Sequence, residues 1–381
     1  MTILHLSDSH LGYNDLDKVN ANGVNVREQD FYDAFAKCID AAIEHQVDVV
    51  IHSGDFFHRP SPPNRPMIFA LQQLHRLAEK NIPFVVIAGN HETPKTIYTS
   101  PILEAFQTLP NVHPMFGQAY EQTQLGELVM HGLPHINDER TLHEEMDKLA
   151  PVEGKFNIIM LHTSIGKEYI MDEYGEQLYP PERIAVLDQF DYVALGHWHN
   201  FQSVSKLKAG WYSGSTERMS ETEIGKEKGY CLLHLEKGKA VEPTFVSIPT
   251  RPWHKIEIKD CQDKTTEAIE DELLQAVSEL PTEGAVLTIV FHKIKPLQSI
   301  SLSNRYLQEK IPGALHLHFK RQFVHEERSA FAKLSEQTES MEELISAFIE
   351  ENTDEEKRAQ TLSTKASYYY NLYQTGEYRN R

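Results

Sequence analysis

The stretch TILHLSDSH (residues 2–10) places a short apolar run directly before the polar residues Asp8 and His10. An apolar run of this length that stops at polar residues predicts a β-strand followed by a loop. The pattern recurs in VDVVIHSGD (47–55) and in IPFVVIAGNH (82–91), where the run ends at a glycine and a polar residue. We therefore expect three buried strands, each with chemically active side chains at its carboxyl end.

Apolar residues at helical spacing predict a helix over 28–45 and another over 66–80. Strands that alternate with helices favour a parallel sheet with helical crossovers. Later in the chain the strand pattern becomes denser, at 128–133, 156–162, 191–196, 210–213, 230–235 and 244–248. We expect an α/β fold in which two sheets form a sandwich with helices on its outer faces.

The pattern of predicted strands and helices changes near PTRP (249–252). Beyond it, strand patterns at 253–258, 285–292 and 314–319 alternate with helical patterns at 264–279 and 301–311. The last part lacks a strand pattern, but Met341, Leu344, Ile345 and Phe348 share one helix face, and 355–373 indicates another helix. The expected domains are therefore a main domain (1–250), a small α+β domain (251–325) and a helical C-terminal segment (326–381).

Composition limits the class of protein. The 381 residues include 37 Lys and Arg against 56 Asp and Glu, a formal net charge of −19. Because proteins that coat DNA are normally basic, such an acidic chain would need a basic partner or groove to hold DNA. The chain has neither a signal-peptide pattern nor an apolar run long enough to span a membrane. Its three cysteines are scattered, which favours a reducing, cytoplasmic location.

Five short blocks of histidine, aspartate and asparagine follow the predicted strands. Any one block alone is weak, because a histidine at a strand end is more often structural than a ligand. Together, in this order, they form a specific combination. The blocks are Asp8-x-His10, Gly54-Asp55 with His58, Gly89-Asn90-His91, His162-Thr163 and Gly196-His197-x-His199.

This combination of residues suits a pair of divalent cations. Two cations roughly 3.5–4 Å apart can clamp a phosphate and activate a water molecule, and Asp55 is the natural carboxylate to lie between them. Mixed imidazole, amide and carboxylate ligands suit manganese, iron or zinc better than calcium. Glycines before Asp55, Asn90 and His197 are expected to let the backbone turn sharply.

The order of the blocks resembles the calcineurin-like metallophosphoesterases over residues 3–215. LHLSDSHLGY, SGDFFHRPSPP, AGNHE, LGHWH and YSGSTER resemble more closely the SbcD/Mre-eleven nucleases, which repair DNA double-strand breaks. The segment after residue 252 is similar to the DNA-capping domain of that family. The expected fold is thus a metallophosphoesterase sandwich with a capping domain and C-terminal helices.

The resemblance assigns a role to each matching residue. One metal ion would be held by Asp8, His10, Asp55 and His199, and the other by Asp55, Asn90, His162 and His197. His91 would stabilise the transition state or protonate the leaving oxygen, and His58 would lie near the phosphate and serve exonuclease activity. Glu92 departs from the usual GNHD block, and we expect little effect from one additional methylene.

The resemblance also implies an activity and partners. We expect a nuclease with two manganese ions per subunit, acting as a 3′–5′ exonuclease and single-strand endonuclease on double-strand-break ends. An ABC ATPase of the SbcC/Rad-fifty type would bind residues 326–381. Helices 66–80 and 96–109 would form a homodimer. No membrane partner is expected, and the location would be prokaryotic and nucleoid-associated. Basic residues near the blocks are either phosphate contacts or solvated side chains: Arg59, Arg65, Lys95, Arg218 and Lys226.

Two alternatives stay open. A phosphoprotein phosphatase or a phosphodiesterase of small nucleotides would use the same metal chemistry, although protein phosphatases of this type carry GDxxDRG and this chain has GDFFHR at 54–59. A non-catalytic scaffold in an ATPase complex would predict a damaged ligand set, yet every expected ligand is present in the sequence.

Overall fold

A computed structural model describes the whole chain except residues 97, 167–176, 325–344, 347, 350–355 and 375–381. Contacts within the chain define two compact units. The first contains residues 1–255, 280–288 and 313–318, and the second contains 256–279, 289–312 and 319–381. The domain boundaries expected from the sequence stay a prediction. None of the helices in the described ranges has both the length and the apolar character that a membrane span requires.

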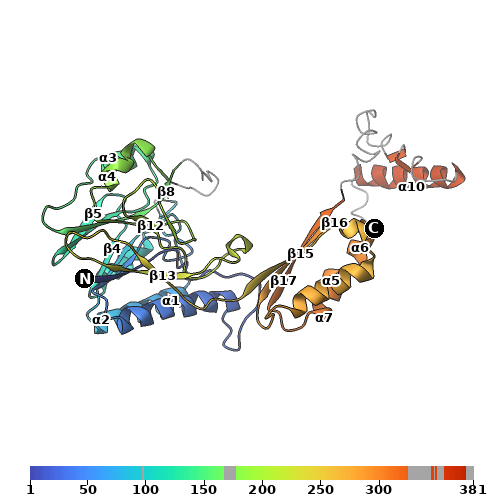
Figure 1. Ribbon diagram of the computed structural model, residues 1–381. Coiled ribbons are helices and arrows are strands. Elements are labelled where there is room, and N and C mark those ends of the chain that lie inside the picture. Colours follow the sequence, from blue (N-terminus) through green and yellow to red (C-terminus); the bar gives the residue numbers. More distant parts are fainter. Residues whose placement is uncertain (97, 167–176, 325–344, 347, 350–355, 375–381) are drawn as a thin grey trace. The chain divides into compact units, whose positions relative to one another are not determined.

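The first unit contains two six-stranded sheets (Figure 1). In the first sheet, of order β14-β13-β1-β2-β3-β4, the four strands from β1 to β4 run parallel and the other two pair antiparallel. Its strands are β1 (Thr2–Leu6), β2 (Val49–His52), β3 (Phe84–Ile87), β4 (Val112–Met115), β13 (Gly229–His234) and β14 (Thr244–Ser247).

The second sheet has the order β11-β12-β10-β7-β6-β5, and its four central strands run parallel. In its register Gly196 pairs with His162, which brings the ends of two chemically active blocks side by side. The strands are β5 (Glu121–Leu125), β6 (Leu128–Leu133), β7 (Phe156–His162), β10 (Tyr192–Gly196), β11 (Gln202–Ser203) and β12 (Gly210–Tyr212).

Alternation of side chains along the strands builds a four-layer sandwich. In β1, Leu4 and Leu6 belong to the core beneath the helices α1 (Val26–Glu44) and α2 (Asn64–Glu79), whereas Ile3 belongs to the core between the two sheets. The second sheet alternates likewise, and its outer face packs on α3 (Glu139–Met146) and α4 (Ile184–Leu187). Because neighbouring residues of a strand point to opposite faces, apolar runs are required where both faces are covered.

The strands predicted for this unit and the helices predicted over 28–45 and 66–80 are confirmed, with shifts of a few residues at their ends. The helix expected over 96–109 is instead a short 3-10 helix at Ile102–Thr108. The strands β4 and β5 and the helix α3 were not predicted. β4 contains a proline and β5 is the polar sequence EQTQL, and each lies at the edge of its sheet. Edge strands are covered by fewer neighbours and tolerate such residues, so they carry a weaker sequence signal.

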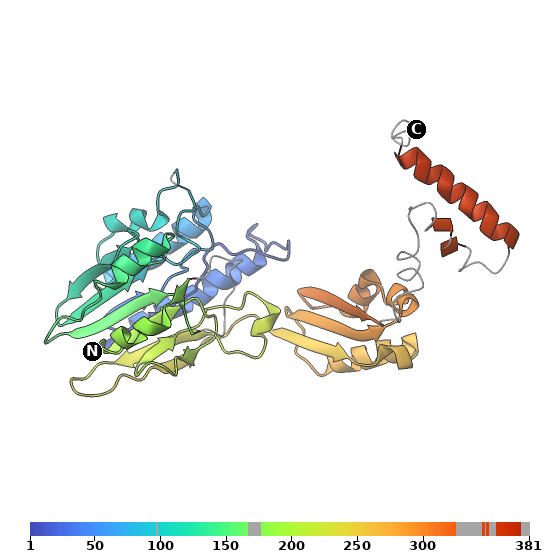
Figure 2. The same ribbon diagram turned by 90° about the horizontal axis from the view of Figure 1, so that it is seen from above.

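A third sheet is three-stranded, of order β15-β16-β17, and appears in yellow and orange in Figure 2. Buried Ile269 and Leu273 of α5 contribute to the apolar interior of the second unit. The predicted helix through Met341 and Leu344 lies largely outside the described residues, whereas the predicted helix over 355–373 is confirmed as α10. The elements are β15 (Trp253–Ile258), β16 (Val286–Ile294), β17 (His316–Phe323), α5 (Thr266–Ser278), α6 (Pro296–Ser301), α7 (Asn304–Lys310) and α10 (Glu356–Gln374).

Short elements complete the described chain. They are the paired strands β8 (Ser164–Ile165) and β9 (Leu178–Tyr179), and 3-10 turns at Ile102–Thr108, Pro181–Arg183, Glu221–Glu223 and Cys261–Asp263.

Candidate metal centre

All five blocks lie at the carboxyl ends of parallel strands. The first three follow β1, β2 and β3 of the first sheet, and the other two end β7 and follow β10 of the second sheet. The structure brings the seven predicted ligands together from both sheets, at one end of the sandwich. They are Asp8, His10, Asp55, Asn90, His162, His197 and His199.

On one side of this cluster, two imidazoles face each other. Nε2 of His10 lies 3.2 Å from Nε2 of His199, and 3.7 Å from Oδ2 of Asp55. The carboxylate of Asp8 accepts hydrogen bonds from the backbone N–H of His197 at 3.1 Å, and its Oδ1 lies 4.0 Å from Nε2 of His199. Asp8, His10 and His199 thus form one group of potential ligands.

On the other side, His162 is central. Its Nε2 lies 3.2 Å from Oδ2 of Asp55 and 3.1 Å from Oδ1 of Asn90, and its ring centroid is 5.4 Å from that of His197. Its Nδ1 donates a hydrogen bond to the carbonyl of Ser53 at 2.8 Å, so Nε2 is the nitrogen left for a ligand. The same oxygen of Asp55 therefore faces histidines on both sides.

These distances fit bound cations. Ligand atoms about 2.1 Å from one metal ion are separated by roughly 3 Å from each other, which matches the contacts around His162 and between His10 and His199. Burial lowers the pKa of His10 well below its usual value, which favours the neutral imidazole that binds metals. Burial alone would raise the pKa of Asp55, but His162 and His91 outweigh it and hold that pKa well below its usual range. Burial alone would lower the pKa of His162, but Asp55 outweighs it and raises that pKa to about 10. A cation that binds there would therefore displace a proton from this imidazole.

The backbone is strained where the ligands are attached. Asp8, His10, Asp55 and His197 have positive φ angles of 51°, 40°, 54° and 95°. Such conformations cost about 1–3 kcal/mol each for residues with a side chain, and they concentrate at functional sites. Backbone hydrogen bonds hold two of these turns together: Asp8 N–H donates to the carbonyl of Gly54 and His10 N–H to that of Asp55, both at 3.0 Å.

The glycines before three of the ligands have two different roles. Gly54 has a φ of +89° and makes the sharp turn expected from the sequence. Gly89 and Gly196 have no positive φ, so the expectation that they make sharp backbone turns is wrong. A side chain at either position would instead collide with neighbouring atoms. A Cβ on Gly89 would lie 2.2 Å from Oδ1 of Asp55, and one on Gly196 would lie 2.0 Å from the carbonyl oxygen of Ser53.

His91 and His58 lie beside the cluster. The backbone N–H of His91 donates to Oδ1 of Asp55 at 3.0 Å, and its Nδ1 donates to the carbonyl of His58 at 2.9 Å. Its Nε2, 3.9 Å from Oδ2 of Asp55, is the nitrogen left for a substrate. The ring of His58 lies 5.5 Å from that of His10, and burial, His91 and Arg59 lower its pKa to about 4.

Glu92 joins two of the blocks. Its buried carboxylate accepts hydrogen bonds from Phe57 N–H at 2.8 Å and from Gly89 N–H at 3.0 Å. The side chain therefore fixes the loop that carries Asp55 against the loop that carries Asn90.

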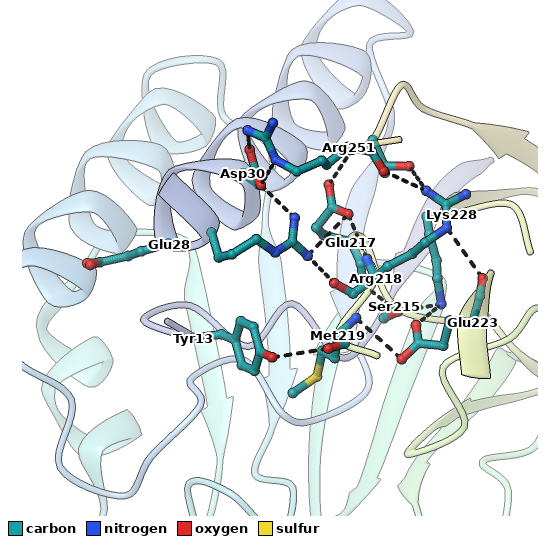
Figure 3. Close-up of polar contacts among 12 residues, drawn as sticks. Tyr13, Glu28, Asp30, Ser215, Glu217, Arg218, Met219, Glu223, Lys228 and Arg251 are labelled. Atoms are coloured by element: carbon teal, nitrogen blue, oxygen red, sulfur yellow. Dashed lines mark hydrogen bonds and ion pairs between the residues drawn. The ribbon is translucent and has the colours of Figure 1, made fainter. Parts of the chain in front are cut away.

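The sequence analysis missed a buried ion pair beside His199. Oε1 of Glu223 accepts a hydrogen bond from Nδ1 of His199 at 3.2 Å, and its Oε2 contacts the ammonium of Lys228. Figure 3 shows this pair together with Ser215 and Arg218. Both residues lie in a polar loop without periodicity, so neither helical nor strand spacing could indicate their burial.

The sequence left Arg218 open between a phosphate contact and a solvated side chain, and the structure directs its guanidinium to the protein itself. Its guanidinium donates to the carbonyls of Glu223, at 3.3 Å, and Lys226, at 2.7 Å, and to the hydroxyl of Thr250. These donors are therefore used to hold the loop that carries Glu223, and they are not directed to a phosphate.

Comparison with known proteins identifies a family and several relatives of this chain. A sequence profile of the calcineurin-like phosphoesterase family matches residues 1–201. A protein of Sulfurisphaera tokodaii called DNA double-strand break repair protein Mre11 is 38% identical over 59% of this chain and 57% of its own length. Proteins of the same name from Sulfolobus acidocaldarius (33% identical; 71% of this chain, 69% of that protein) and Saccharolobus solfataricus (29%; 81% and 82%) also match.

Proposed function

Because the chain belongs to the Mre11 family of calcineurin-like phosphoesterases, we propose that it is a metal-dependent nuclease that processes the ends of DNA double-strand breaks. The observation that carries the proposal is the cluster around Asp55, whose single oxygen Oδ2 faces His10 at 3.7 Å and His162 at 3.2 Å. The alignment with the S. tokodaii relative spans 57% of that protein. The DNA substrate, the direction of degradation and the partners are therefore part of the proposal, as the activity is.

The proposed ligands divide into two sets that share Asp55. Asp8, His10 and His199 would complete one site, and Asn90, His162 and His197 the other. When bound, two divalent cations polarise the phosphodiester and supply a hydroxide nucleophile at neutral pH. We propose manganese as the metal, since imidazole and carboxylate ligands together suit it.

The two remaining histidines act on the substrate in this proposal. His91 Nδ1 is fixed by the carbonyl of His58, so a second proton on His91 would be carried by Nε2, which is directed toward the cluster. In that form His91 can stabilise charge on the phosphate or donate a proton to the leaving oxygen. His58, held neutral by burial, would position the DNA end.

The experiment is a cleavage assay with manganese on blunt linear duplex, on single-stranded circles and on p-nitrophenyl phosphate. Wild type is compared with Asp55→Asn and with Asp271→Asn, which changes an exposed carboxylate of α5. We expect wild type and Asp271→Asn to degrade DNA from 3′ ends and to cut single strands, and Asp55→Asn to be inactive. Hydrolysis of p-nitrophenyl phosphate without DNA cleavage would favour a small-substrate phosphoesterase. No hydrolysis by wild type would favour a scaffold.

We also propose an ATPase partner of the SbcC/Rad-fifty type on the C-terminal segment. Leu362, Tyr368 and Tyr369 of α10 are 41%, 54% and 57% exposed, so this helix offers apolar and aromatic side chains to a partner. The partner would supply basic surface that a chain of net charge −19 lacks. Deletion of residues 326–381 should abolish co-purification with the ATPase, and unchanged co-purification would refute this assignment. A homodimer through α2, whose Ile68 is 54% exposed, completes the proposed assembly.

A further inference from the structure

The two proposed metal sites hold their histidines in different ways. Nδ1 of His162 donates to a main-chain carbonyl, that of Ser53, at 2.8 Å. Nδ1 of His199 instead donates to a side chain, the carboxylate of Glu223, at 3.2 Å. A partner on Nδ1 fixes the orientation of the ring and leaves Nε2 as the ligand atom. The orientation of His199 thus depends on a residue that can be replaced.

Glu223 is itself held on several sides. Its Oε1 also accepts a hydrogen bond from the backbone N–H of Met219 at 3.4 Å, and its other oxygen contacts the ammonium of Lys228. Its own carbonyl accepts a hydrogen bond from Arg218 at 3.3 Å (Figure 3). Glu223 as a whole is 5% exposed, so water contributes little to the solvation of its carboxylate.

Lys228 contacts the ligand residue a second time. Its ammonium, which is 1% exposed, donates to the carbonyl of His199 at 2.6 Å and to the hydroxyl of Ser215 at 2.9 Å. Glu223 contacts the same ammonium as an ion pair, so three groups surround it. His199 is therefore fixed by its ring through Glu223 and by its main chain through Lys228.

We infer that Glu223 and Lys228 are positioning residues for His199, and that they set the metal affinity of one of the two sites selectively. The inference rests on the proposed function, because it takes His199 as a metal ligand. Partners that orient a metal-binding histidine typically contribute 10- to 100-fold to metal affinity. The site that contains His162 should be unaffected by changes in this pair.

The test is titration of the full-length, metal-free protein with Mn²⁺ by isothermal calorimetry. Wild type should bind two ions per chain. Glu223→Ala should bind one ion as wild type does and the other about 10- to 100-fold more weakly, with Glu223→Gln between the two. Lys228→Met should weaken the same site. Glu227→Gln, an exposed carboxylate of the same loop, is the matched control and should bind as wild type.

Combination with the ligand itself identifies the affected site. His199→Ala should weaken one site more than Glu223→Ala does, and adding Glu223→Ala to it should change nothing further, because the ring that Glu223 orients is gone. Additive losses in the double variant, or two normal sites in Glu223→Ala, would overturn the inference. Urea unfolding of the metal-free variants shows whether they are folded. If Glu223→Ala is unfolded, the Mn²⁺ titration of Glu223→Gln decides instead. If wild type binds no Mn²⁺, the proposed function fails instead.

Discussion

Replacement of Gly196 by alanine tests the close approach of the two sheets at the candidate site. The new Cβ would lie 2.0 Å from the carbonyl oxygen of Ser53 and 2.8 Å from Nδ1 of His162. Non-bonded carbon and oxygen atoms come no closer than roughly 3.3 Å, so the carbonyl would have to move by about 1 Å or more. That movement separates Ser53 from the imidazole it holds.

Three contributions set the expected change in the free energy of unfolding of Gly196→Ala. Overpacking of a close-packed region costs about 1–3 kcal/mol. Loss of the buried hydrogen bond between His162 and Ser53 adds about 1 kcal/mol. Alanine restricts the unfolded chain and offsets about 0.4–1 kcal/mol of this loss. We expect Gly196→Ala to lower the free energy of unfolding by about 1–3.5 kcal/mol, and to weaken Mn²⁺ binding about 10- to 100-fold at the site of His162.

Tryptophan fluorescence during urea unfolding provides the assay. Trp211 lies in β12 and Trp198 just after β10, so these two report on the sandwich, whereas Trp253 lies in β15 of the three-stranded sheet. Gly126→Ala is the control: its Cβ would meet nothing within 4 Å, and only its φ of +65° costs energy, about 1–2 kcal/mol. An unfolding free energy no lower than that of Gly126→Ala, together with Mn²⁺ affinity equal to wild type, would refute the steric reasoning.

Three further changes have expected outcomes of their own. Burial lowers the pKa of His5 to about 3, so between pH 6.5 and 3 the unfolded chain takes up a proton that the folded chain does not. In urea unfolding of the metal-free protein, the free energy of unfolding should decrease as the pH is lowered from 7 to 5. His5→Gln should remove about 2 kcal/mol of this decrease. A variant with the same pH dependence as wild type would contradict this. Phe56→Ala, at a fully buried ring, should cost about 3–5 kcal/mol of unfolding free energy by the same method, and a loss below 1 kcal/mol would argue against the packing. Arg251→Met removes two hydrogen bonds to Asp30, at 2.5 and 2.6 Å, and should cost about 2 kcal/mol, whereas Arg305→Met at an exposed ion pair should cost less than about 0.5; equal thermal midpoints would count against the difference.

The proposed ligands could be placed at strand ends from the sequence because the pattern that marks each of them is local. Asp8 and Asp55 each stand just beyond an apolar run, and the carboxyl ends of parallel strands meet at one edge of a sheet. The pairing of two such sheets then follows from alternation in strands such as β1. These features are encoded within about ten residues, so a single sequence suffices to find them.

The contacts that orient the ligands could not be predicted in this way. Glu223 lies 24 residues from His199 in a polar loop, and its burial depends on Lys228 from the end of that loop. Gly196 shows no unusual φ, and its necessity arises from Ser53 in the other sheet. Each of these depends on the distance between segments that only the folded chain brings together.

The position of Asp55 and His162 in different sheets has a consequence for how the protein unfolds. A cation held by both residues would close a loop of roughly 100 residues, and by analogy with disulfide bonds such a cross-link removes entropy from the unfolded chain, by about 4–5 kcal/mol when the bond persists. Metal loading should therefore stabilise the folded chain against separation of the sheets. Chelation should accelerate hydrogen exchange at the carboxyl ends of β2 and β7 before it affects the far ends of the same strands.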